Sequence, residues 1–175
     1  MLSSIVRFLF PKTCFYCKEL HAGKGLLCQI CLVGLDLITP KGRCHTCFRQ
    51  SPWRKCLICH KSPSPWYRSG SLFSGWTSGE VLLSDPDRFS KEIAAFFIIQ
   101  YYQLYWPLVD ALYIAPSLKP ISRAFTKFLK IPLTTNRGEY AGKKVLYLTK
   151  LHHEGAIPEN LQGARIFYLS YIFPD

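Results

Sequence analysis

Several short motifs that identify enzymes by themselves are missing from this sequence. Its 175 residues contain no P-loop, no GxSxG nucleophile elbow, no HExxH pair and no GxGxxG turn. A membrane-spanning run is also missing, because the longest apolar stretch, 93–99, is closely followed by Gln100 and Gln103 and is too short to cross a bilayer. The sequence therefore excludes the commonest nucleotide-binding and hydrolytic signatures and a transmembrane segment.

Acidic residues are scarce and unevenly placed. The chain has 11 Asp and Glu against 22 Lys and Arg, a formal net charge of +11. Residues 1–70 have a balance of +9, whereas residues 71–175 have a balance of +2. A basic excess favours a polyanionic partner such as DNA or RNA, because binding releases counterions from the phosphates. The alternative is that these side chains only solvate a small surface and partly offset metal-bound thiolates.

Cysteine is absent after residue 59, and all eight cysteines form four CxxC pairs. Ten residues separate the first two pairs and eight separate the last two. One tetrahedral Zn²⁺ can take both thiolates of such a pair at about 2.3 Å, and two pairs complete a closed Cys₄ site. We therefore expect two structural Zn²⁺ ions, with sequential or interleaved pairing left open. The expected ligands are Cys14, Cys17, Cys28, Cys31, Cys44, Cys47, Cys56 and Cys59.

Other uses of these cysteines fit less well. Disulfides need an oxidising compartment, and the first ten residues, interrupted by Arg7, do not resemble a secretory signal. A redox pair would be one CxxC at a helix start, and iron–sulfur ligation uses tighter runs such as CxxCxxC. The cytoplasm is therefore the expected location.

The chain is predicted to divide into two domains, 1–65 and 66–175, at the Pro-rich linker 62–65. Aromatic residues near the CxxC turns either form the small core under each metal site or stack on nucleic-acid bases. These residues are Phe15, Tyr16, Phe48 and Trp53.

In the second domain, predicted strands alternate with predicted helices, which is typical of a parallel α/β sheet. Strands are expected at 69–76, 109–114, 143–148 and 164–173, helices at 89–105 and 122–130, and a helical turn at 159–162. Ligands of such sheets bind beyond the carboxyl ends of the strands, here after Ile114 and Leu148.

This order of parts resembles the ComF family, the competence-associated proteins related to GntX. The resemblance implies an α/β chain: an N-terminal double zinc ribbon, then a truncated type I phosphoribosyltransferase-like parallel sheet with flanking helices. It is carried by Leu9-Phe10-Pro11 before Cys14, the four CxxC pairs, the strand near 73–76, the strand that ends at Pro116, and the strand after Ala141-Gly142-Lys143.

One departure from the family bears on activity. In the family, two acidic residues and a Thr-Thr-Gly-type loop hold the ribose and 5-phosphate of phosphoribosyl pyrophosphate (PRPP). Here Thr149 and Lys150 take the places of the acids, and a cation has the wrong sign to orient ribose hydroxyls or recruit Mg²⁺. Only Gly155 and Ala156 match the end of that loop, and the segment 152–154 offers too few ligands for a metal. We expect no phosphoribosyl transfer and regard PRPP and Mg²⁺ as doubtful ligands.

Three functions follow from these observations. The favoured hypothesis, implied by the resemblance, is a protein that handles single-stranded DNA, or another polyanion, beside the DNA-uptake machinery during natural transformation. The alternatives are a divergent PRPP-dependent phosphoribosyltransferase that uses the loop around Gly155, and a protein–protein adaptor that docks through 89–105. The candidate DNA contacts are Arg43, Arg49, Arg54 and Lys55.

Overall fold

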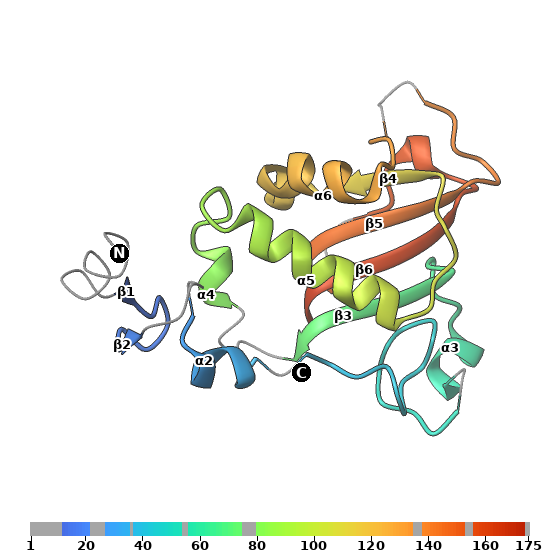
Figure 1. Ribbon diagram of the computed structural model, residues 1–175. Coiled ribbons are helices and arrows are strands. Elements are labelled where there is room, and N and C mark those ends of the chain that lie inside the picture. The colour runs from blue at the N-terminus through green and yellow to red at the C-terminus, as the bar shows by residue number, and fades with distance from the viewer. Residues whose placement is uncertain are drawn as a thin grey trace.

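The computed structural model describes residues 12–21, 27–35, 37–53, 56–74, 80–134, 138–152 and 156–173. It is a mixed α/β structure, with small cysteine-containing segments next to a four-stranded sheet (Figure 1). The cysteine-containing part has a two-stranded antiparallel ribbon and two short helices. These elements are β1 (Lys12–Thr13), β2 (Leu20–His21), α2 (Gln29–Val33) and α3 (Leu57–Lys61).

The main sheet has the strand order β3-β6-β5-β4, and every pair in it is parallel. Its central strands, β5 and β6, are buried along most of their length, as their nearly continuous apolar runs predict. The predicted parallel sheet is therefore confirmed. The strands are β3 (Arg68–Ser74), β4 (Ala111–Ile114), β5 (Lys144–Leu151) and β6 (Arg165–Phe173).

Two helices cover one face of this sheet, α5 (Ser90–Gln103) and α6 (Ser122–Leu129), as Figure 1 shows. Phe97 of α5 joins the two layers, because its ring lies 6.2 Å from that of Phe125 and 5.7 Å from that of Tyr171. Both helices were predicted, α5 from its apolar spacing and α6 as a helix with a basic outer face. The shorter helical elements are α4 (Glu80–Leu83), η1 (Pro116–Ile121) and η2 (Glu159–Leu161).

The opposite face of the sheet is covered by aromatic rings. Trp66 stacks on Tyr168 with ring centroids 4.2 Å apart, and Tyr147 stacks on Tyr113 at 4.5 Å. These rings belong to a second core cluster, because alternate residues of a strand point to opposite faces of its sheet. Trp66 directly follows the predicted linker, so this stack holds the chain against the sheet where it leaves the linker.

Two of the differences between predicted and observed strand boundaries bear on the site. Asp110 precedes β4, and its carboxylate accepts a hydrogen bond from the Lys144 backbone N–H at 2.8 Å, which secures the start of the sheet. β5 continues to Leu151, so Thr149 and Lys150 belong to the strand itself and not to a loop after it.

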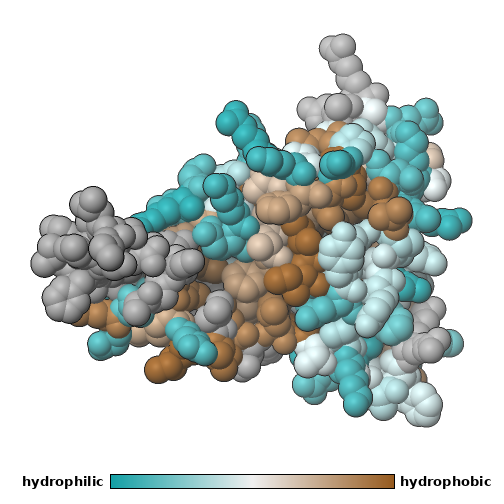
Figure 2. Space-filling model, in the orientation of Figure 1, coloured by the Kyte–Doolittle hydropathy of each residue, from teal (hydrophilic) through white to brown (hydrophobic). Residues whose placement is uncertain are grey.

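The outer side of α5 exposes apolar side chains. Figure 2 shows them near the centre of the view, with hydrophilic side chains over the segment that carries α3. Ile99 is 44% exposed there. Among the described residues, none of the helices has the length and hydrophobicity that crossing a bilayer requires.

Candidate metal centres

The eight cysteines form two four-cysteine clusters, and in each cluster the Sγ atoms lie within 4.8 Å of one another. All eight are free thiols. The pairs combine in sequential order, which their spacing alone did not determine. The first cluster contains Cys14, Cys17, Cys28 and Cys31, and the second contains Cys44, Cys47, Cys56 and Cys59. We call residues 12–35 the first module and residues 40–61 the second module.

The sulfur–sulfur distances fit one tetrahedral ion in each cluster. The Sγ atoms of Cys17 and Cys28 are 3.8 Å apart, and those of Cys44 and Cys59 are 3.9 Å apart. A tetrahedral site with metal–sulfur bonds of about 2.3 Å has sulfur–sulfur edges of about 3.8 Å. A disulfide would bring the atoms to about 2.05 Å. Each cluster could therefore bind one metal ion that accepts four thiolates.

The same backbone turn surrounds the first cysteine of each cluster. The Lys18 N–H donates to the Cys14 carbonyl and the Phe48 N–H donates to the Cys44 carbonyl, both at 2.9 Å. Lys18 and Phe48 each have a φ of 63°, a left-handed conformation that non-glycine residues seldom adopt. The two modules therefore repeat a conformation as well as a CxxC spacing.

A backbone N–H group of the second CxxC pair points at the first sulfur of each cluster. The Cys28 N–H donates to Cys14 Sγ at 3.2 Å, and the Cys56 N–H donates to Cys44 Sγ at 3.4 Å. Burial alone would raise the pKa of these thiols, but N–H donors, including those of the CxxC turns themselves, lower the pKa of Cys14 and of Cys44 to about 6. One thiol in each cluster is thus prepared to bind metal as a thiolate.

The last cysteine of each cluster has a raised pKa instead of a lowered one. Burial and hydrogen bonds with neighbouring thiols raise the pKa of Cys31 to about 12, and the same causes raise the pKa of Cys59. A metal-free cluster therefore keeps some of its protons. Metal binding must displace them, which couples metal uptake to proton release.

The clusters differ in their exposure. The cysteines of the second cluster are all buried, none more than 7% exposed. In the first cluster Cys14 is buried, Cys17 is exposed, and Cys28 and Cys31 are half-buried.

Hydrogen bonds attach the second module to the sheet. At the start of β3, the Ser69 N–H donates to the His45 carbonyl at 2.9 Å and the Ser69 hydroxyl donates to the Thr46 carbonyl at 2.7 Å. His152, just after β5, lies 3.1 Å from the Cys47 carbonyl through Nε2 and 3.1 Å from the Ser170 hydroxyl through Nδ1. Because a carbonyl only accepts, Nε2 carries a proton in its contact with Cys47.

Two residues in the region expected for a phosphoribosyl loop, Thr149 and His152, are used in packing. Thr149 is fully buried, and its hydroxyl contacts the Leu151 carbonyl and, at 3.1 Å, the Tyr168 hydroxyl. His152 lies against the second module, so this module covers the end of β5. Ala156 is exposed, whereas Gly155 lies outside the described residues.

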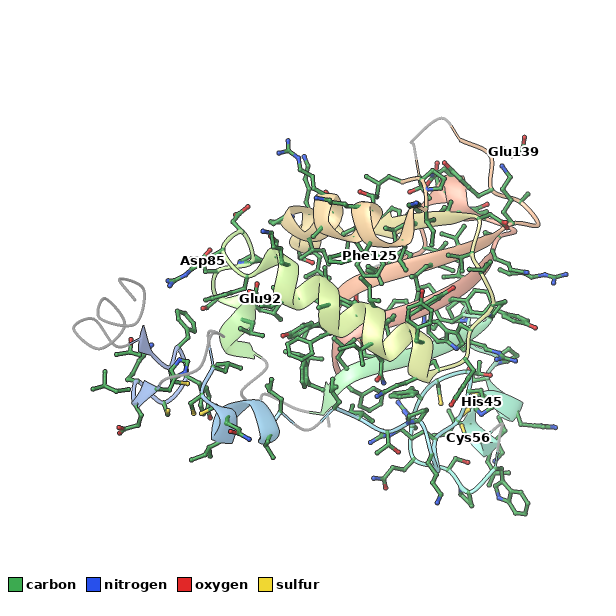
Figure 3. All side chains as sticks on the ribbon, in the orientation of Figure 1. His45, Cys56, Asp85, Glu92, Phe125 and Glu139 are labelled. Carbon is green, nitrogen blue, oxygen red and sulfur yellow. The ribbon has the colours of Figure 1, made fainter. Side chains whose placement is uncertain are left out.

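The predicted nucleic-acid contacts lie on the second module. Arg43 is half-buried and donates from Nη1 to the Phe48 carbonyl at 3.1 Å, and its guanidinium lies 5.3 Å from the centre of the Phe48 ring. Arg49 is exposed, and Arg54 and Lys55 lie outside the described residues. Figure 3 shows His45 and Cys56 on this module, near the end of α5.

Two further cations were missed in the sequence. Lys41 and Arg68 line one cavity together with Arg43. Only the general basic excess of residues 1–70 pointed to them, because Arg68 is far from the other two in the sequence and no local spacing connects it with them.

Comparison of the chain with protein-family models, with curated proteins and with solved structures finds no match. The two cysteine clusters and the parallel sheet are therefore the basis for a functional assignment.

Proposed function

We propose that this is a ComF-like protein that binds two zinc ions and uses its second module to bind single-stranded DNA. The domain on the sheet would have a phosphoribosyltransferase-like fold without its transfer activity. It would serve to hold the second module in place. Thiolate ligands suit a reducing compartment such as the cytoplasm.

One observation carries this proposal, the concentration of positive charge on a rigid metal-binding scaffold. Residues 40–61 contain six Lys and Arg and no Asp or Glu. A Zn²⁺ ion with four thiolates has a net charge of about −2, which leaves an excess of about +4. Among the described residues of this module, Lys41, Arg49 and Lys61 are exposed, and the module is hydrogen-bonded to the sheet, so they would keep their spacing when a phosphate chain binds.

The contacts at the end of β5 argue against phosphoribosyl transfer. Thr149 is buried against Tyr168 and His152 is occupied by the Cys47 carbonyl, so neither is arranged to hold ribose or Mg²⁺. Titration calorimetry with PRPP, with and without Mg²⁺, checks this directly. Saturable Mg²⁺-dependent heat that Gly155→Pro removes would restore the enzyme hypothesis.

DNA binding is tested by fluorescence anisotropy with a labelled single-stranded oligonucleotide at several salt concentrations. The association constant should fall with salt at a logarithmic slope of about −0.7 for each phosphate neutralised. Arg43→Glu and Arg49→Glu should each weaken binding, whatever the base sequence. The matched control is Arg123→Glu on α6, an exposed arginine outside the module. An association constant that changes neither with salt nor with the substitutions in the module would contradict the proposal.

The adaptor alternative has its own support in the apolar surface of α5. Ile99 and, beyond the helix, Leu108 are 44% and 82% exposed. Sedimentation velocity of the chain at rising concentration tests self-association through this surface. An association that Ile99→Glu abolishes, in a protein that does not bind DNA, would favour the adaptor.

A further inference from the structure

A cavity of about 400 Å³ lies at the junction of the second module and the end of α5. The module contributes Lys41 and Arg43, the start of β3 contributes Arg68, and the residues just after α5 contribute Tyr105 and Trp106. We call this cavity the junction cleft. It brings together cations and aromatic rings from three separate parts of the chain.

The charge of the junction cleft suits a phosphate. Three of its side chains carry a positive charge at neutral pH, and among the described residues that line it there is no Asp or Glu. Arg43 is held by its hydrogen bond to the Phe48 carbonyl, and Arg68 lies with its guanidinium 5.9 Å from the centre of the Tyr67 ring. An arginine that is already positioned loses less entropy when it binds a phosphate oxygen.

Tyr105 is the unusual residue of the cleft. Its side chain is 90% exposed, yet its backbone has a φ of 50°, which is unfavourable for a bulky residue. The helix cannot continue past it because Pro107 follows, and the Tyr105 N–H instead donates to the Tyr102 carbonyl at 3.0 Å. Strained backbone of this kind is concentrated at binding sites. An exposed aromatic ring there is explained by a ligand that stacks on it.

Trp106 supplies a fixed wall beside that ring. It is only 9% exposed, and its ring packs 6.2 Å from Tyr101 and 5.5 Å from Phe167. The aromatic side of the junction cleft thus has one anchored ring and one exposed ring. A flat aromatic group such as a nucleobase fits next to them.

A second, more open cavity of about 750 Å³ continues from this site. It shares Lys41 and Arg43 with the junction cleft and is also lined by Gln50 and Ser51. The two cations therefore lie between two hollows. A ligand that occupies both hollows must pass over these cations, as the backbone of a nucleic-acid strand would.

From these contacts we propose that the junction cleft is a binding site for single-stranded nucleic acid. One base stacks on Tyr105 beside Trp106, its phosphates lie on Arg68 and Arg43, and the strand passes Lys41 into the second cavity. This inference rests on the proposed function and adds the base-binding site to it. It requires single strands, because the bases of a duplex are stacked inside the helix and cannot reach Tyr105.

Tyr105→Gly provides a sharp test, because glycine adopts a positive φ without strain. The variant should unfold at the same temperature as the unmodified chain or higher, while it binds a labelled octathymidylate about tenfold more weakly, since stacking on one base is lost. Tyr105→Phe should bind normally, and Arg68→Gln should weaken binding and flatten its salt dependence. Tyr102→Ala and Arg123→Gln are the matched controls, since these exposed residues do not line the cleft.

Each other outcome identifies which proposal fails. If Tyr105→Gly and Arg68→Gln bind like the unmodified chain while Arg49→Glu binds weakly, the module binds DNA and the junction cleft does not. If the unmodified chain binds no oligonucleotide at low salt, both proposals are wrong. If a duplex of equal length or free thymidine monophosphate binds as tightly as the octathymidylate, the cleft is not a site for a single strand.

Discussion

The two cysteine modules share one metal-binding conformation and differ in nearly everything around it. By sequence, residues 12–35 contain three Lys and one Glu, whereas residues 40–61 contain six Lys and Arg and no acid. A divalent metal ion bound by four thiolates would have a net charge of about −2, so the first module would be close to neutral and the second would have an excess of about +4. The same four-cysteine conformation therefore occurs in two modules of very different charge.

The modules also differ in how they join the rest of the molecule. The first packs against the residues just before α5, with the Phe15 ring 4.5 Å from that of Phe89 and the Arg88 guanidinium 5.3 Å from Phe15, and its Leu35 belongs to the main core cluster. The second is attached through the hydrogen bonds of Ser69 and His152 and through Phe48, which is 1% exposed. The second module is therefore fixed to the sheet by directed hydrogen bonds and a buried turn, whereas the first joins the core mainly through apolar contacts.

The segment between the modules is itself bound to the sheet. The Ile38 N–H donates to the Leu72 carbonyl at 2.7 Å, and the amide of Gln100 on α5 donates to the carbonyls of Ile38 and Ser71. This buried amide connects the segment, the helix and β3 at one point. Unfolding of the first module should therefore not extend past this segment, and the sheet should stay folded.

Removal of one cysteine from each cluster should show the largest difference. A structural zinc site contributes on the order of 10 kcal/mol, which is comparable to the whole stability of a small domain. We expect Cys44→Ser to lose one metal ion and to unfold the sheet as well. Cys17→Ser should lose one ion and keep the cooperative unfolding of the sheet. Metal content by mass spectrometry and thermal unfolding by circular dichroism measure both effects, and equal losses of sheet stability would contradict the comparison.

Local sequence patterns predicted some features of the fold but not how the two modules are placed against the sheet. The CxxC spacing was sufficient to predict that the eight cysteines gather where they could bind metal, and the apolar runs of β5 and β6 were sufficient to predict two central strands. The strand order was not predictable, because it places the first strand of the sheet beside the last. Pairings between such distant segments depend on the packing of the entire domain and leave no periodic signal.

His152 illustrates the limit most clearly. In the sequence it belongs to a polar loop segment after a strand, where ligand-binding residues are expected. In the structure it is 5% exposed and contacts a carbonyl of the second module. A residue's neighbours from a distant module decide its role, so the composition of the loop could not reveal it. The joint position of Lys41 and Arg68 was hidden for the same reason.

Phe48→Gly should produce the next largest effect. The substitution relieves the positive φ of this position but removes a buried ring that lies 6.3 Å from Phe173. Loss of such a ring costs about 3–5 kcal/mol, while relief of the backbone returns about 1 kcal/mol and the greater entropy of an unfolded glycine costs about the same. We expect a net destabilisation of about 4 kcal/mol in urea unfolding. A change below about 1 kcal/mol would mean that the second module does not share the core of the sheet.

His152→Ala should have a smaller but similar effect. It leaves the Cys47 carbonyl and the Ser170 hydroxyl without the ring between them, at a cost of about 2 kcal/mol. It should also speed the release of one of the two metal ions to a chelator, because Cys47 is a ligand of the second cluster. His60→Ala is the control, since His60 is exposed on the same module. Faster release of both ions would show that His152 does not act on the second module alone. Faster release of neither would show that it does not stabilise that module.

Lys18→Gly should have the smallest effect, although Lys18 has the same φ as Phe48. Relief of the left-handed backbone contributes about 1 kcal/mol. The greater entropy of an unfolded glycine costs a similar amount and cancels this gain. Loss of the 2.7 Å hydrogen bond from Lys18 Nζ to the Phe15 carbonyl then leaves a net cost of about 1 kcal/mol. Chelator-induced release from the first cluster should therefore become only slightly faster. The large cost at Phe48 and the small cost at Lys18 would separate the effect of the shared turn from that of its packing, because Phe48 is buried and Lys18 is exposed.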